Sequence, residues 1–101
     1  FTRAKSFDTF CPLGPVIQTN FEQNPELGIK CFVNDELKQD GNTRDMIFSV
    51  GEILQFVSSI MTLLPGDVVL TGTPDGVSKV QPGDEIKIEI ETIGTLINPV
   101  K

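Results

Sequence analysis

The sequence predicts a mixed β fold with one α-helix, an α+β architecture, from three patterns. Residues 85–91 alternate apolar and charged side chains, the period of a strand with one buried face. Residues 29–33 and 36–39 flank an Asn-Asp pair that tolerates positive φ, so they are expected to form a β-hairpin. Residues 50–61 repeat apolar side chains at helical spacing.

The predicted helix has a clear start and a clear end. Ser49, with Glu52 three residues later, forms a capping box in front of it. The apolar face that follows consists of Val50, Ile53, Leu54, Val57, Ile60 and Met61. Leu64-Pro65-Gly66 stops the helix, because proline disfavours a helical residue before it and glycine permits the reversal.

Two further strands are expected near the end of the chain. Residues 68–71 are short, β-branched and apolar, as expected of a central strand covered on both faces. Gly94 interrupts the alternating run, and residues 95–97 are expected to form a last short strand before Asn98-Pro99.

Composition limits both size and chemistry. A chain of 101 residues is one domain or a piece of one. Fourteen acidic against eight basic residues give a net charge of −6, which argues against binding nucleic acid or an anionic membrane surface. The chain has no histidine, so these residues cannot build a Ser-His-Asp triad or a histidine-ligated metal site.

The two cysteines indicate the kind of cellular compartment in which the protein is expected. Cys11 and Cys31 lie twenty residues apart without a Cys-x-x-Cys motif, which favours buried, reduced thiols over a disulfide framework. No run approaches the roughly 20 apolar residues of a membrane span, and no basic, then apolar leader opens the chain. A cytoplasmic location is therefore expected.

Three clusters do not fit a plain core: residues 5–10, 42–46 and 71–77. The third follows the predicted central strand, and its glycines and proline allow a sharp turn that would aim amides and threonine hydroxyls at a ligand carboxylate. The same composition also suits an ordinary turn. Lys5 could stabilise a developing oxyanion, although most lysines are simply exposed.

Two acidic residues in these clusters are candidate metal ligands. Asp8 and Asp45 each lack a second carboxylate at metal-ligand spacing. They are therefore predicted to be turn and capping residues.

Four segments, taken in order, closely resemble the fumarylacetoacetate hydrolase family. They are residues 5–15, 43–48, 61–67 and 71–77, and the closing residues 93–98 extend the resemblance across essentially the whole chain. It implies a β-sandwich or β-roll fold, present as a partial domain. Residues 1–101 would be the C-terminal portion of a catalytic domain in a cytoplasmic homodimer.

The resemblance also implies chemistry on small oxo- and hydroxy-dicarboxylates with Mg²⁺, or else Mn²⁺ or Ca²⁺. An enolate-like intermediate would serve C–C bond hydrolysis, decarboxylation or 2-hydroxy-dienedioate isomerisation. Lys5 matches the catalytic lysine beside the metal-bound substrate oxygens, and Thr9 matches a hydroxyl in the same environment. Thr73 matches the residue that holds the substrate carboxylate, and Gly72 the neighbour that allows close approach.

The chain departs from the family pattern at two places. Several members have Ser or Ala at the position of Cys11, and Gly-Val-Gly where Gly76-Val77-Ser78 stands. The altered exit of that loop leaves the substrate open. The resemblance also leaves open the choice among hydrolase, isomerase and decarboxylase, because one metal-enolate strategy serves all three and the family's discriminating acid-base groups belong to a lid upstream of Lys5.

The family's metal ligands belong upstream of Lys5, so no metal ligand is expected within these 101 residues. The remaining N-terminal part of the same domain is then an expected partner, and the piece alone is expected to be inactive. The alternative is a non-catalytic acidic β domain that binds a small carboxylate or a protein partner.

Overall fold

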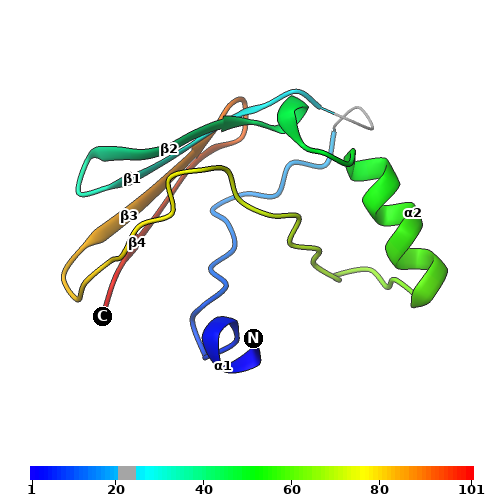
Figure 1. Ribbon diagram of the computed structural model, residues 1–101, viewed down its shortest axis with the longest axis horizontal. Coiled ribbons are helices and arrows are strands. Elements are labelled where there is room, and N and C mark those ends of the chain that lie inside the picture. Colours follow the sequence, from blue (N-terminus) through cyan, green and yellow to red (C-terminus); the bar gives the residue numbers. More distant parts are fainter. Residues whose placement is uncertain (21–24) are drawn as a thin grey trace.

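The computed structural model describes residues 1–20 and 25–101 and contains a four-stranded antiparallel sheet in the order β2-β1-β3-β4 (Figure 1). The strands are β1 (Gly28–Val33), β2 (Glu36–Asn42), β3 (Glu85–Ile90) and β4 (Gly94–Pro99). The helices are α1 (Thr2–Lys5), α2 (Val50–Ile60) and the 3₁₀ turn η1 (Thr43–Asp45). The predicted α+β class is confirmed.

The sheet follows the predicted hairpin and alternation. Asn34 and Asp35, between β1 and β2, have φ angles of 50° and 64°, the left-handed pair that a tight hairpin turn requires. Directly opposed residues of antiparallel strands share a face. The pairs on one face are Ile29 with Ile90, Cys31 with Ile88, and Val33 with Ile86. We refer to this set of residues as the apolar face of the sheet.

Helix α2 confirms both the predicted helix and its capping box. The Ser49 hydroxyl accepts from the Glu52 amide at 3.3 Å, and the Glu52 carboxylate accepts from the Ser49 amide at 2.8 Å. The backbone and side-chain hydrogen bonds from Ser49 lower the pKa of Glu52. Helical residues end at Ile60, four residues before Leu64, where the sequence predicts the stop signal to begin.

Residues 68–71 do not form a strand, and that prediction was wrong. An apolar, β-branched run fits a pleated surface, but it becomes a strand only where a neighbouring strand supplies hydrogen bonds. No strand among residues 1–20 and 25–101 pairs with it. The turns α1 and η1 were not predicted, since each spans no more than four residues and leaves no periodic signal.

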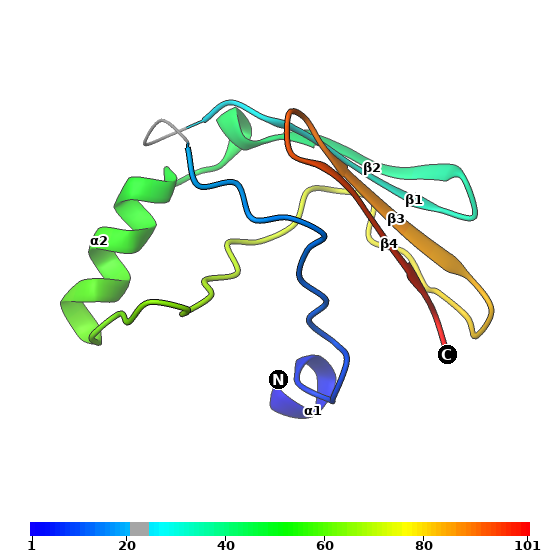
Figure 2. The same cartoon turned by 180° about the vertical axis from the view of Figure 1, so that it is seen from behind.

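The sheet and α2 lie on opposite sides of the molecule, and the chain leaving α2 runs back to β3 between them (Figures 1 and 2). Val33, 9% exposed, is the one hydrophobic side chain within the described residues that is buried. Cys11 is exposed and Cys31 half-buried, both unbridged, so the expectation of two buried thiols fails at Cys11. No helix in the described part of the chain has the length and apolarity to cross a bilayer.

Asp84 stabilises the turn before β3 through hydrogen bonds to its carboxylate. The effect of these bonds on the pKa of Asp84 predicts that the stability of the protein depends on pH. Its carboxylate accepts from the Gln81 amide and from Asn34 Nδ2, each at 2.8 Å, and these two bonds lower the pKa of Asp84. The stabilisation is therefore present above the unfolded-state pKa of about 3.9. It is lost as the pH falls through the lower folded-state pKa.

Replacing Asp84 with Asn in the intact protein that carries these residues should lower the urea midpoint at neutral pH. The difference in urea midpoint between wild type and Asp84→Asn should become smaller as the pH falls below about 4. Asp40→Asn, on an exposed side chain of β2, serves as the control. A difference in urea midpoint between wild type and Asp84→Asn that stays constant down to acid pH would contradict the prediction.

Candidate functional site

The loop of residues 71–77 is held against strand β2 on the apolar face of the sheet. Gln39 Nε2 donates to Thr73 Oγ1 and to the Pro74 carbonyl oxygen, each at 2.7 Å. Gly41 pairs with Ile29 in the ladder and therefore shares the apolar face. A Cβ on Gly41 would lie 2.9 Å from Pro74 Cβ, so the absence of a side chain there lets the loop approach.

A β-bulge in β2 brings the strand backbone to the end of this loop. The register shifts between Cys31 and Phe32, whose partners are Gln39 and Leu37, and this leaves Lys38 as the extra residue. A Cβ on Gly76 would lie 1.9 Å from the Lys38 carbonyl oxygen. Gly76 also has φ +99°, so both the contact and the backbone angle require glycine.

The ligand-facing residues predicted in this loop are open to solvent. Thr73 is exposed although its oxygen is held by Gln39. Gly72 has φ +143°, and nothing lies within 4 Å of the place where its Cβ would stand. A small anion could therefore reach both the hydroxyl and the adjoining backbone, an arrangement of donors that suits a carboxylate.

Lys5 and Thr9 lie on a different segment. Lys5 is the exposed last residue of α1, and Thr9, with φ 71°, lies in the turn that follows. The Phe10 amide closes that turn on the Phe7 carbonyl at 3.1 Å, and the two rings pack edge to face at 5.5 Å between centroids.

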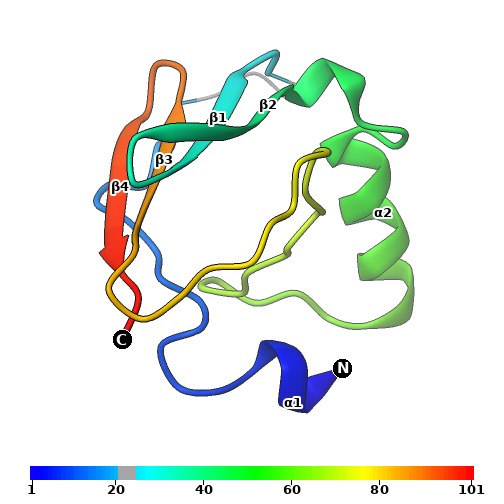
Figure 3. The ribbon, with the colours of Figure 1, turned by 60° about the vertical axis from the view of Figure 1, so that its left-hand side comes forward.

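The structure brings Thr73 and Gly72 together but does not join them to Lys5 or Thr9. Within residues 1–20 and 25–101, no hydrogen bond or ion pair links the α1 segment to the loop. Figure 3 shows α1 apart from the sheet on which the loop is anchored. The roles assigned to these four residues therefore stay predictions.

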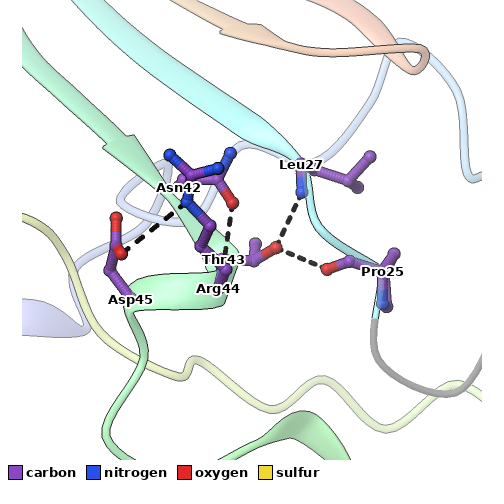
Figure 4. Close-up of polar contacts among 6 residues, drawn as sticks. All are labelled: Pro25, Leu27, Asn42, Thr43, Arg44 and Asp45. Carbon is purple, nitrogen blue, oxygen red and sulfur yellow. Dashed lines mark hydrogen bonds and ion pairs between the residues drawn. The ribbon is translucent and has the colours of Figure 1, made fainter.

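The second cluster, residues 42–46, has a structural explanation (Figure 4). Thr43 Oγ1 accepts from the Leu27 amide at 2.8 Å and donates to the Pro25 carbonyl oxygen. The Arg44 amide donates to Asn42 Oδ1 at 3.0 Å, which caps η1. These contacts tie η1 to the entry of β1 and account for the polar residues without a ligand.

The described residues do not fit a metal ion. Across ranges 1–20 and 25–101, no three or more His, Cys, Asp or Glu side chains gather closely enough to hold one. Asp8 lies in the turn after α1 and Asp45 in η1, as predicted for turn residues. Burial raises the pKa of the Cys31 thiol, which keeps it protonated and disfavours a thiolate ligand or nucleophile.

Two hollows of the surface lie away from this loop. One, of about 690 Å³, is lined by Gly28, Lys30 and residues 89–95 at the β3–β4 turn. Another, of about 300 Å³, lies between η1 and the start of α2. Neither is lined by the predicted site residues.

Sequence reasoning missed Gln39. The sequence did not reveal it, because a two-residue turn pairs Val33 with Glu36 and would place Lys38 opposite Cys31. Only the bulge at Lys38 brings Gln39 onto the apolar face. A polar residue on an otherwise apolar face indicates a specific partner.

A family model described as fumarylacetoacetate (FAA) hydrolase C-terminal matches residues 1–101. An uncharacterised protein of Methanocaldococcus jannaschii is 55% identical over 101 residues, which cover 100% of this chain and 42% of that protein. The crystal structure of 2-hydroxyhepta-2,4-diene-1,7-dioate isomerase from Mycobacterium marinum is 51% identical with a TM-score of 0.92, covering 97% of this chain and 38% of that one.

Maleylpyruvate hydrolase from Sphingobium sp. SYK-6, in complex with manganese(II) ion and pyruvate, is 43% identical with a TM-score of 0.88, over 93% of this chain and 36% of that one. Other similar proteins are named as a mitochondrial oxaloacetate tautomerase of Bos taurus and a 4-hydroxyphenylacetate degradation bifunctional isomerase/decarboxylase of Salmonella dublin. The chain spans about two fifths of the length of the first relatives, from 42% to 38%.

Proposed function

The chain belongs to the fumarylacetoacetate hydrolase C-terminal family, and from that premise we propose that it forms the substrate-facing part of an enzyme acting on small oxo- and hydroxy-dicarboxylates. Proteins similar to it are named as isomerases, hydrolases, decarboxylases and oxaloacetate tautomerases. Stabilising an enolate or a related oxyanion is a step that these reactions can share, which is why one site can serve all of them.

The anchored loop is the observation that carries the proposal. Gln39 and Gly76 hold the loop on β2, while Thr73 and Gly72 stay exposed. Thr73 would donate its hydroxyl hydrogen to a substrate carboxylate, and Gly72 would let that carboxylate approach the backbone. The pyruvate complex of the similar maleylpyruvate hydrolase supports an oxo-acid as the ligand class.

Lys5 would supply the positive charge and Thr9 a second hydroxyl. Lys5 forms no ion pair with any residue in the described part of the chain, so its ammonium is not neutralised by a neighbouring carboxylate. In a site closed to water, such a charge stabilises a developing oxyanion far better than it does at an open surface. For this role Lys5 and Thr9 must approach the loop in the intact protein.

A divalent cation, Mg²⁺, Mn²⁺ or Ca²⁺, would have to be bound by ligands from outside the described residues, because these do not form a metal site. The manganese in the similar maleylpyruvate hydrolase supports a metal requirement for the whole protein. The part played by this chain is then to bind and orient the organic acid.

Thr73→Val should weaken pyruvate binding to the intact protein by roughly tenfold and leave Mn²⁺ affinity nearly unchanged. The change removes one hydrogen-bond donor to a charged group, worth about 1.5 kcal/mol or more, and touches no cation ligand. Paired calorimetric titrations with Mn²⁺ and with pyruvate measure both affinities. Thr95→Val, an exposed threonine of β4, is the matched control. Equal losses for metal and pyruvate would refute the assignment.

A further inference from the structure

Gln39 is a polar side chain on the apolar face of the sheet. Its ladder partner is Cys31, which in turn opposes Ile88, so the amide lies in line with aliphatic neighbours. Gln39 is half-buried there, and an amide partly withdrawn from water is stabilised by hydrogen-bond partners within the protein. The partners come from the loop, 34 and 35 residues along the chain, as Thr73 Oγ1 and the Pro74 carbonyl oxygen.

The two hydrogen bonds fix which way the amide faces. A primary amide nitrogen carries two hydrogens, and Gln39 Nε2 uses one for each loop acceptor at 2.7 Å. Turning the amide over would place its oxygen against the Pro74 carbonyl oxygen, which is repulsive. Both amide hydrogens of Gln39 are therefore used in hydrogen bonds to the loop.

The hydrogen bond from Gln39 to Thr73 limits the direction in which the Thr73 hydroxyl can donate. A hydroxyl has one hydrogen to donate and two lone pairs that accept. Because Thr73 Oγ1 accepts from Gln39, its own hydrogen cannot point toward Gln39 and is left for another acceptor. An incoming carboxylate is such an acceptor, and a hydroxyl already oriented toward it does not need to reorganise on binding.

We propose that Gln39 is a positioning residue that turns the Thr73 hydroxyl hydrogen toward the substrate carboxylate; this rests on the proposed role of Thr73. Gln39 acts through Thr73 and does not itself touch the ligand. Its second hydrogen bond, to Pro74, fixes the backbone next to Thr73, so one amide sets both the place and the direction of the donor.

The test is a double-mutant cycle in the intact protein, with pyruvate as the probe and calorimetry as the measurement. Gln39→Met removes both donors at similar volume and should weaken pyruvate binding about tenfold, since it loses the orientation of one charge-assisted hydrogen bond. Gln39→Glu keeps the shape but presents only acceptors when ionised, so it would draw the Thr73 hydrogen to itself and weaken binding further. In a Thr73→Val background, Gln39→Met should change the affinity less than twofold.

The outcomes separate this inference from the proposal on which it rests. If Thr73→Val alone leaves pyruvate affinity unchanged, the proposed role of Thr73 fails. If Thr73→Val weakens binding but Gln39→Met has no effect, or the two losses multiply in the double variant, the positioning role fails while that of Thr73 stands. Multiplying losses would mean that Gln39 supports the loop only structurally. Asp40→Asn, on the neighbouring exposed residue, should bind pyruvate as wild type does.

Discussion

Replacing Lys5 with Met in the intact protein is expected to lower kcat about 100-fold or more while changing KM much less. The proposed ammonium interacts most strongly with negative charge that develops on the substrate oxygen in the transition state. An interaction made mainly in the transition state appears in kcat, whereas one made equally with the bound substrate would appear in KM. Steady-state kinetics on a panel of oxo-dicarboxylates that begins with oxaloacetate would measure both constants.

Two variants of the same helix make this experiment specific. Arg3→Met removes one positive charge from α1 but lies two residues before the proposed position, so its kinetics should stay near wild type. Lys5→Arg keeps the charge on a broader group and should retain more activity than Lys5→Met. Wild-type turnover in Lys5→Met, or an equal loss in Arg3→Met, would exclude the proposed role.

The elements that the sequence predicted correctly are those with local signals. The Asn34-Asp35 turn selects its own backbone angles, and Ser49 with Glu52 caps α2 through contacts three residues apart. The alternation in β3 needs only one buried face. Residues 68–71 failed because their pattern describes a suitable strand surface, whereas pairing depends on a neighbour that the described residues do not provide.

In the candidate site, too, the features with local sequence signals were predicted and those that depend on distant contacts were not. The motif at residues 71–77 identified the loop, since Gly and Pro are typical of loops and turns. What holds the loop could not be predicted, because the Gln39 bond to Thr73 crosses 34 residues and the Lys38 carbonyl faces Gly76 only through a β-bulge. The neighbours of Lys5 only allowed a role for it, and the family resemblance assigned the roles of Lys5 and Thr9. Their approach to the loop stays a prediction.

The contact between β2 and the loop also determines what one methyl group at Gly76 would do. An alanine Cβ there would stand 1.9 Å from the Lys38 carbonyl oxygen and 3.0 Å from its carbonyl carbon. Both are backbone atoms of a paired strand, so the loop must move instead. Any movement lengthens the bonds from Gln39 to Thr73 and Pro74.

Gly76→Ala is therefore expected to destabilise the intact protein by on the order of 3 kcal/mol and to weaken pyruvate binding at least tenfold. Strain from the positive φ and overpacking each contribute about 1–3 kcal/mol. Gly66→Ala separates the two causes, since Gly66 has φ +96° against +99° at Gly76, but nothing lies within 4 Å of its Cβ position. Gly66→Ala should show only the smaller, conformational loss in urea unfolding and should keep pyruvate affinity. Equal destabilisation in both variants would show that the backbone angle accounts for the whole effect, and that the loop does not depend on its close contact with Lys38.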